Sequence, residues 1–225
     1  MNPVPHEALR DWYVTQRPLY DGLCKVLENT LRSVLDREGI HFLSVSARPK
    51  TVDSLMEKVR RKTYLDPRNE ITDLAGARII TYVEGDLERV CQIIRKLFRV
   101  HDPKSPDKMA QLGVDRIGYR SVHYVCDLGD DRCKLPEFEV HKNLLFEVQI
   151  RTVLQHAWAE IEHDRGYKFG GILDPSLRRR LNLVAGLLEI ADREFSAIAR
   201  DIDKTSLASR IPEDDIVSST ESQTT

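Results

Sequence analysis

The stretch that most constrains the fold covers residues 144–164, LLFEVQIRTVLQHAWAEIEHD. Its first half alternates apolar and polar residues, and the polar ones are Glu147, Gln149 and Arg151. A period of two predicts a strand with one buried face and one open face, and the helical spacing of apolar residues from Thr152 onward predicts a helix directly after it. Taken alone, the stretch also fits an ordinary half-buried strand whose polar face meets only water. Whether that face carries chemistry depends on residues elsewhere in the chain.

Length and composition place the chain among globular proteins. Its 225 residues are 41% hydrophobic and 31% charged, which suits one domain with or without helical appendages. The formal net charge is −2, so no overall basic field points to nucleic acid, although basic clusters stand at residues 60–62 and 178–180. The four cysteines form no CxxC pair, which argues against a zinc site or a disulfide framework and fits a reducing cytosol. Because no apolar run approaches about 18 residues, we expect a cytoplasmic protein without a membrane segment.

The periodicity along the chain predicts an α+β fold with helical flanks. Helical spacing covers residues 7–37, where Pro18 could kink the helix, and then residues 51–64, 86–98 and 174–203. Strand patterns cover residues 41–47, 75–83, 99–101 and 119–128. Two connections are expected, a long loop at residues 102–118 and a polar connection or hairpin at residues 129–142. Residues 204–225 are rich in Ser, Thr and Asp/Glu, are poor in large apolar groups and are expected to be disordered.

A first group of candidate site residues lies around the predicted start of a helix at Thr51. Lys50, Ser54 and Lys58 are spaced by four, so they share one stripe of that helix and its beginning, with Arg48 just before them. Two cations and a hydroxyl beside a helix N-terminus could hold a polyphosphate, helped by backbone N–H groups and the helix dipole. The same spacing also fits a solvated lysine face.

A second group lies at the start of a strongly apolar strand, where Asp73 precedes Ala-Gly-Ala and Arg78 stands among apolar neighbours. An arginine in such a strand needs a partner, because burying an unpaired charge is costly. The partner could be Asp73 or Glu147 within the protein, or the phosphate of a ligand.

A third group follows Gly118, in a strand pattern that places Tyr119, Ser121 and His123 on one face. A tyrosine next to a glycine could stack on a nucleobase, although a buried tyrosine in a sheet is the commoner use of that residue.

Three polar residues after the opening strand, His156, Glu160 and His163, lie near one another on the predicted helix. They do not form the H-E-x-x-H pattern of a zinc site, so we interpret them as polar contacts that line or support a site.

Together these motifs resemble the synthetase domain of the RelA/SpoT family, the alarmone synthetases. The matches are R-x-K-x3-S-x3-K at residues 48–58, D-L-x-G-x-R at 73–78, G-Y-x-S-x-H at 118–123, and E-x-Q-I-R-T followed by H-A-W-A-E-x-E-H-D at 147–164. Each motif is weak by itself, but all of them occur in the family's order and cover about residues 40–170.

The resemblance implies a nucleotidyltransferase-like mixed β-sheet core with flanking N- and C-terminal helices. It divides the chain into an N-terminal helical segment at 1–39, a synthetase domain at 40–172, a C-terminal helix at 173–203 and a tail at 204–225. It also implies a small single-domain synthetase, and small members of the family often form homotetramers through their terminal helices.

The activity that the resemblance implies is pyrophosphoryl transfer from ATP to the 3′-hydroxyl of GDP or GTP, which makes (p)ppGpp for the stringent response. Carried over to this sequence, Arg48 would stack on adenine, and the residues that would hold the ATP phosphates are Lys50, Ser54, Lys58 and Arg78. Tyr119 would stack on the acceptor guanine, and the acceptor side would be completed by His123, Gln149 and Arg151. Asp73 and Glu147 would hold Mg²⁺, with Glu147 also helping to deprotonate the hydroxyl.

One position departs from the family pattern. Four residues before Tyr119, where many members have a basic residue that can meet acceptor phosphates, this chain has Asp115. An alternative therefore stays open, in which a toxic relative of these enzymes modifies the 3′ CCA end of tRNA or an adenine nucleotide, with tRNA held by Arg178 and Arg179. A nucleotide-binding module without catalysis is a further alternative, against which the intact Asp73 and Glu147 argue.

Overall fold

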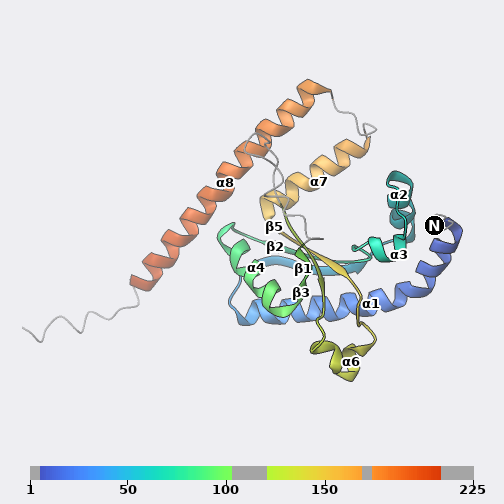
Figure 1. Ribbon diagram of the computed structural model, residues 1–225. Helices are drawn as coiled ribbons and strands as arrows, with labels where there is room; N and C mark the ends of the chain where they lie inside the picture. Colours follow the sequence, from blue (N-terminus) through green and yellow to red (C-terminus); the bar gives the residue numbers. More distant parts are fainter. Residues whose placement is uncertain (1–5, 103–120, 169–173, 209–225) are drawn as a thin grey trace, which may run out of the picture.

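The computed structural model describes residues 6–102, 121–168 and 174–208 (Figure 1). Within these residues five strands form one sheet in the order β1-β2-β5-β4-β3. The strands are β1 (Phe42–Pro49), β2 (Ala75–Thr81), β3 (Arg99–Val100), β4 (Val122–Asp127) and β5 (Phe146–Thr152). The helices are α1 (His6–Arg37), α2 (Val52–Arg61), α3 (Pro67–Glu70), α4 (Gly85–Leu97), the 3₁₀ helix η2 (Arg132–Lys134), α6 (Pro136–Glu139), α7 (Val153–Lys168) and α8 (Pro175–Ala208). The α+β class and the mixed sheet expected from the sequence are confirmed.

The strand predicted in the opening stretch lies at the centre of the sheet. β5 pairs parallel with β2 and antiparallel with β4, and its residues alternate between buried and half-buried as the sequence pattern predicts. β1 pairs antiparallel with β2 on the other side. The register sets Gly76 beside Glu147 and Arg78 beside Gln149, so the polar residues of neighbouring strands share one face of the sheet.

The opposite face of the sheet forms the hydrophobic core with α1 and α4. Val148 and Ile150 of β5 are fully buried there, and the Phe98 and Phe146 rings meet edge to face with centroids 5.1 Å apart. The leucines of α1 that recur at helical spacing are also fully buried in this core, namely Leu23, Leu27, Leu31 and Leu35. The amphipathic period of each element therefore decides which face of the sheet is covered and which is left open.

The first helix, α1, matches its expected range closely and is not split at Pro18, which lies inside it. The helix passes beneath the sheet (Figure 1) and ends at Arg37, after which Gly39 adopts a φ of 64°. A positive φ is readily adopted by glycine, so Gly39 ends the helix as its sequence position predicts.

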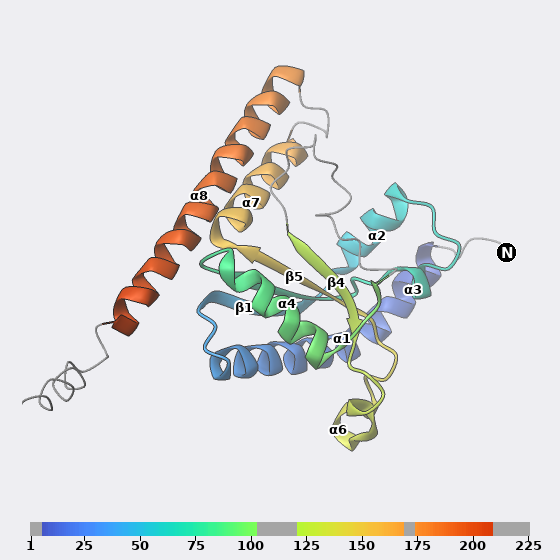
Figure 2. The same ribbon diagram turned by 60° about the vertical axis from the view of Figure 1, so that its left-hand side comes forward.

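The two last helices, α7 and α8, lie side by side on the other side of the sheet from α1 (Figure 2). Asp174 caps α8 by accepting a hydrogen bond from the Ser176 backbone N–H at 2.8 Å. Two buried polar contacts hold α8 to the domain: the Thr152 hydroxyl donates to Asp192 at 2.6 Å, and the Gly85 backbone N–H donates to the Ser196 hydroxyl at 3.1 Å.

Three boundaries differ from the sequence expectation. α8 runs to Ala208, so residues 204–208 are helical and not disordered, because helical periodicity persists past the expected end. α2 ends at Arg61 and not near residue 64. The connection at residues 129–142 contains η2 and α6 in place of a plain hairpin loop, although β4 and β5 pair antiparallel across it.

Most of the expected loop at residues 102–118, together with residues 209–225, lies outside the described residues. Among the described helices, none combines the length and the apolar character that crossing a bilayer requires. All four cysteines are free thiols.

The Thr152–Asp192 contact generates a stability prediction. Both side chains are nearly inaccessible, with exposed fractions of 0% and 2%. Thr152→Val keeps the shape but leaves the Asp192 carboxylate without its hydroxyl donor, so we expect a loss of about 1–3 kcal/mol in the free energy of unfolding. Urea denaturation of the wild type and the variant measures this loss in the free energy of unfolding. The control is Thr15→Val on the exposed face of α1, expected to change stability by less than about 0.5 kcal/mol, and equal losses in both variants would contradict the prediction.

Candidate active site

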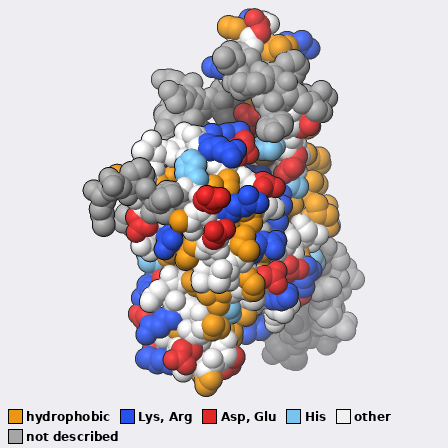
Figure 3. Space-filling view, turned by 90° about the vertical axis from the view of Figure 1, so that its right-hand side faces the viewer, with side chains coloured by type: hydrophobic (Ala, Val, Ile, Leu, Met, Phe, Trp, Pro, Cys, Tyr) orange, Lys and Arg blue, Asp and Glu red, His pale blue; other side chains and the backbone are white. Residues whose placement is uncertain are grey.

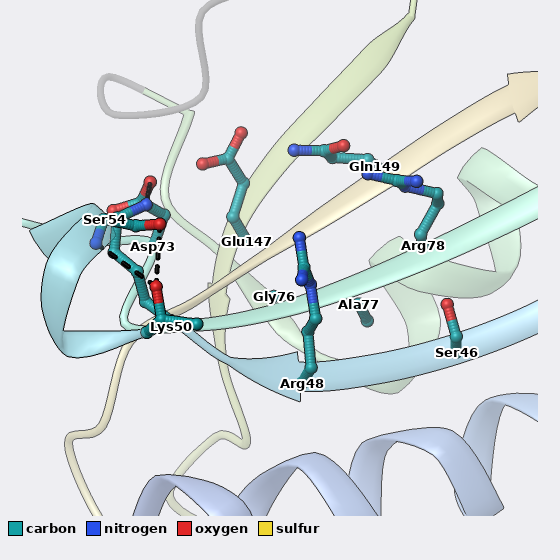
Figure 4. A pocket seen from close by; sticks show the side chains of 11 residues that line it. Ser46, Arg48, Lys50, Ser54, Asp73, Gly76, Ala77, Arg78, Glu147 and Gln149 are labelled. Atoms are coloured by element: carbon teal, nitrogen blue, oxygen red, sulfur yellow. Dashed lines mark hydrogen bonds and ion pairs between the residues drawn. The ribbon is translucent and has the colours of Figure 1, made fainter. Parts of the chain in front are cut away.

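The polar face of the sheet carries a cavity of about 190 Å³ where β1, α2, β2 and β5 come together (Figure 4). Its lining residues are Ser46, Arg48, Lys50, Thr51, Ser54, Asp73, Gly76, Ala77, Arg78, Glu147 and Gln149. Three of the four motifs found in the sequence, which are up to about a hundred residues apart in the chain, therefore meet in one place. The fourth, at residues 118–123, contributes only its last three residues to the described structure.

The beginning of α2 is built as its sequence predicts. The Thr51 side chain caps the helix by accepting a hydrogen bond from the Ser54 backbone N–H at 3.2 Å. Leu55 is buried in the core, which turns Ser54 and Lys58 toward the open face. Lys50 precedes the helix and Ser54 lies in its first turn, whereas Lys58 lies in its last turn, so only Lys50 and Ser54 stand next to the helix N-terminus.

Asp73 joins the two lysines of the predicted stripe. Its Oδ2 lies 2.8 Å from the Lys50 Nζ and its Oδ1 lies 2.8 Å from the Lys58 Nζ. The carboxylate side chain is 20% exposed. Burial by itself raises the pKa of Asp73, but the hydrogen bonds and charges of Lys50 and Lys58 outweigh it, and the net effect lowers the pKa. The arrangement keeps Asp73 ionised and brings both ammonium groups to one carboxylate. Lys50 and Asp73 line the cavity, whereas Lys58 lies behind them and is joined to it through Asp73.

The floor of the cavity is low because Gly76 has no side chain. In the register of the sheet Gly76 stands between Arg48 of β1 and Glu147 of β5. Arg48 and Glu147 rise from the strands on either side of this gap and point to the same side of the sheet (Figure 4). A ligand group can therefore approach the backbone between a guanidinium and a carboxylate.

The partner of Arg78 differs from the sequence expectation. Its guanidinium pairs with neither Asp73 nor Glu147 inside the described structure, but with Glu160 of α7, at 3.3 Å. Glu160 also lies 3.6 Å from the His156 Nδ1. Asp73 is engaged by the lysines, and the helix that follows β5 folds back over the polar face, which brings Glu160 within reach. The interpretation of His156 and Glu160 as supporting polar residues therefore fits their contacts.

Glu147 is linked to the third motif through His123. The His123 Nδ1 lies 2.5 Å from the Glu147 Oε1, and its Nε2 lies 2.6 Å from the Ser121 hydroxyl. His123 is 6% exposed, so its ring is held firmly between the two groups. Ser121 and His123 share one strand face, as predicted, whereas Tyr119 and Asp115 lie outside the described residues.

Gln149 and Arg151 follow Glu147 along the same face, but only Gln149 lines the cavity. Arg151 lies deeper, where burial and the nearby charge of Arg78 lower its pKa, and its Nε has no hydrogen bond within the described residues. Burial and the charge of Arg78 also lower the pKa of His156. This end of the face is therefore rich in cationic and basic groups and is offset by Glu160.

Two lining residues were not assigned to the site from the sequence, Ser46 and Thr51, and Glu160 was expected to support the site but not to be the partner of Arg78. Ser46 could have been found, because it stands two positions before Arg48 in a strand and so shares its face. The Glu160 contact has no local signal.

The region that forms the cavity is similar to known proteins. A family model described as a region found in RelA/SpoT proteins matches residues 47–172, more than half of the chain. The chain belongs to the RelA/SpoT family. The motifs that meet in the cavity are thus those of a RelA/SpoT synthetase region.

Relatives within the RelA/SpoT family include the GTP pyrophosphokinase YjbM of Bacillus subtilis, 33% identical over 178 residues that cover 77% of this chain and 78% of the relative. Among solved structures, the small alarmone synthetase 1 of Bacillus subtilis bound to its product pppGpp aligns with a TM-score of 0.69 and 30% identity, covering 86% of this chain and 98% of that one. The same synthetase bound to AMPCPP aligns with a TM-score of 0.64 and 28% identity, covering 87% and 99%. These matches confirm the fold and the family expected from the motifs.

The ion pairs of Asp73 predict a dependence of stability on pH. Because the folded-state pKa lies below the ordinary value of about 3.9, the contribution of Asp73 is present above that pH and is lost as the pH falls through the folded-state pKa. The free energy of unfolding of the wild type should exceed that of Asp73→Asn at neutral pH, and the gap should shrink below about pH 4. Asp53→Asn, an exposed position on α2, is the control. A gap for Asp73→Asn that stays constant or widens toward pH 3 would contradict the assignment.

Proposed function

We propose that this chain is a GTP diphosphokinase that transfers the pyrophosphoryl group of ATP to the 3′-hydroxyl of GDP or GTP and so makes (p)ppGpp. The observation that carries the proposal is the meeting of Arg48, the Lys50–Asp73–Lys58 cluster, Arg78 and Glu147 around one cavity of a RelA/SpoT fold. Its relatives named as GTP pyrophosphokinase, and the related synthetase with pppGpp bound, support the same reaction and the stringent-response role.

The donor side of the cavity suits ATP. Lys50 and Ser54 stand at the positively polarised start of α2, where a triphosphate gains from the helix dipole. Lys58, in the last turn of the helix, adds a second cation beside Lys50 through their shared contact with Asp73. Arg78 adds a guanidinium, and Arg48 offers a planar face on which adenine can stack. Before substrate binds, Asp73 and Glu160 neutralise Lys50, Lys58 and Arg78, so these cations are already held in place when phosphate oxygens replace the carboxylate oxygens on them.

The two carboxylates suit Mg²⁺. Asp73 and Glu147 line the same cavity, and carboxylate oxygens together with substrate phosphates are the ligands that this ion prefers. One oxygen of Glu147 lies 2.5 Å from the His123 Nδ1, which orients the carboxylate at the cavity. When bound, Mg²⁺ would supply charge neutralisation on the transferred group. The donor set of this chain therefore fits the ion.

The acceptor side is formed by His123, Gln149 and Arg151, with Tyr119 as the proposed stacking residue. In the reaction the 3′-oxygen of the acceptor forms a bond to the β-phosphorus of ATP, the bond from that phosphorus to the oxygen bridging the α-phosphate breaks, and AMP leaves. The proton of the hydroxyl passes to Glu147, which His123 and Ser121 orient through hydrogen bonds. The rest of the catalysis is positioning and charge stabilisation, which is what phosphoryl-type transfer chiefly needs.

The alternative acceptor, tRNA, finds little support in the charge distribution of the face that carries α2 and α3. On the side of the molecule that carries α2 and α3, basic side chains are interspersed with acidic and hydrophobic ones (Figure 3). A polyanion binds best to a continuous basic surface, because the phosphate backbone dominates its affinity. We keep GDP and GTP as the proposed acceptors.

Location and assembly are further parts of the proposal. Four free, buried thiols fit a reducing cytoplasm. Assembly into a homo-oligomer, such as a tetramer, is supported by α8, which exposes several large apolar side chains: Leu183, Val184, Leu187, Ile190, Phe195, Ile198 and Ile202.

The reaction itself is tested with purified protein, labelled ATP, Mg²⁺ and, one at a time, GDP, GTP, an adenine nucleotide and tRNA. Label is expected to enter guanosine tetra- and pentaphosphate. Glu147→Gln should abolish turnover while ATP still binds, because it removes the proton acceptor but no donor-side cation. Label that appears only in tRNA or in an adenine nucleotide would overturn the acceptor assignment. The absence of transfer to every acceptor would overturn the proposed enzymatic activity.

The donor site is tested by Lys58→Ala. Loss of one charge-assisted contact of about 1.5–3 kcal/mol should lower kcat/KM for ATP roughly 10- to 100-fold. The matched control is Lys62→Ala, an exposed lysine at the end of the same helix, which should leave kcat/KM within about twofold. Equal effects of the two substitutions would show that the lysine stripe is not the phosphate site.

A further inference from the structure

A second pocket lies where α1, α3 and the turn before β5 come together, away from the polar face of the sheet. Its volume is about 310 Å³, and we call it the α1–α3 pocket after Trp12, Gln16, Tyr20, Arg68 and Asn143, which line it together with four neighbours. Both ribbon views show α3 close to α1, on the side of the molecule away from α8 (Figures 1 and 2). None of the residues assigned to ATP or acceptor binding lines this pocket.

One wall of the α1–α3 pocket is aromatic and cationic. Trp12 and Tyr20 lie two turns apart on one face of α1, and the Arg68 guanidinium stands 5.4 Å from the centre of a Trp12 ring. Ile71 forms part of the buried floor. A planar ring is the shape that such a wall accommodates with the most contact.

Several polar groups at the α1–α3 pocket have no hydrogen-bond partner among the described residues. Tyr20 is 6% exposed, yet its hydroxyl makes no hydrogen bond within the described residues, and burial raises its pKa. Within the same part of the chain, the side-chain amides of Gln16 and Asn143 make none either. The Tyr20 hydroxyl is not cut off from the surface, Gln16 is half-buried and Asn143 is exposed, so all three groups can meet a ligand and form a hydrogen-bonding edge at the pocket.

The backbone conformation of Asn143 also sets this pocket apart. It adopts a φ of 64°, and among the described residues other than glycine it is the only one with a positive φ. Asparagine tolerates this conformation better than most residues, but the conformation still costs free energy. The surrounding structure must therefore hold Asn143 in it. The turn thus keeps the Asn143 amide at the rim of the pocket.

Arg68 is left without a counter-charge although acids flank it. Asp66 accepts a hydrogen bond from the Asn69 side chain at 2.7 Å, and Glu70 accepts one from the Asp66 backbone N–H. Both carboxylates are therefore occupied in holding the single turn of α3. In the described structure Arg68 makes no ion pair, so its charge is free to meet an anion at the pocket.

We propose that the α1–α3 pocket is a second ligand site, which takes a planar heteroaromatic ring with hydrogen-bonding edges and an attached anionic group. The ring lies against Trp12 and over Tyr20, its edge meets the amides of Gln16 and Asn143, and the anion pairs with Arg68. The site is distinct from the catalytic cavity and does not depend on the proposed reaction.

The pocket also has a defined relation to the catalytic carboxylates. Ile71 precedes Asp73 by two residues, and Leu145, another lining residue, precedes Glu147 by two. Tyr13, next to Trp12 on α1, donates a hydrogen bond to the Lys50 carbonyl oxygen at 2.7 Å. A ligand in the pocket therefore contacts both chain segments that lead to Asp73 and Glu147.

The test uses the fluorescence of Trp12, one of two tryptophans in the chain. The probes are AMP and GMP at millimolar concentration, with adenosine as a ring without the anion and ribose 5-phosphate as an anion without the ring. At least one nucleotide should change the emission of the wild type and of Trp158→Phe, but not of Trp12→Phe. The two partial probes should act more weakly, because each lacks half of the contacts.

The variants locate the binding. Arg68→Ala should weaken the apparent affinity by about tenfold or more, the value of a lost charge-assisted contact, and Gln16→Ala should weaken it by a smaller factor. Arg10→Ala, an exposed arginine of α1 that does not line the pocket, should leave the affinity unchanged. Lys50→Ala with Lys58→Ala should leave it unchanged too, which separates this site from the catalytic one.

Two outcomes would overturn the proposal. One is the absence of any Trp12 response to AMP or GMP. The other is a response that survives Arg68→Ala and Gln16→Ala but disappears when Lys50 and Lys58 are replaced, since the nucleotide would then be binding in the catalytic cavity.

Discussion

The site depends on one structural constraint, the parallel pairing of β2 with β5. The pairing sets Glu147 beside Gly76 and Gln149 beside Arg78. Its register is held from the other face, where Ala77, Ile79 and the apolar residues of β5 are buried against α1 and α4. A slip by one residue would turn the polar side chains into the core and the apolar ones into the cavity, so hydrophobic packing on one face fixes the geometry of the other.

A second constraint is the pairing of three cations at or beside the cavity, Lys50, Lys58 and Arg78, with carboxylates. Asp73 lies between Lys50 and Lys58, and Glu160 reaches Arg78 from α7. Partly buried ion pairs of this kind contribute little net stability, because desolvation offsets much of the attraction. Their consequence is positional: the carboxylates hold the cations where, in the proposed function, phosphate oxygens would take their place.

Much of the local structure could be predicted from periodicity alone. The alternation of β5, the lysine stripe of α2 and the long helix from residue 7 all appear in the structure with shifts of a few residues. The partner of Arg78 could not be predicted, because Glu160 stands 82 positions away on an element that folds back over the sheet. The contacts that join Ser121 to His123 and His123 to Glu147 could not be predicted either, because they depend on β4 lying beside β5.

By itself, the sequence determined which elements form, which face of each is polar, and which side chains are available for chemistry. These are local properties that follow from the period of a strand or a helix and from the motifs at residues 48–58, 73–78 and 147–164. Only the tertiary structure decided which acid meets which base, and that Trp12, Arg68 and Asn143 surround a second pocket. The physical reason is that these contacts join elements distant in the chain, whose positions follow from the packing of the whole core and not from any local pattern.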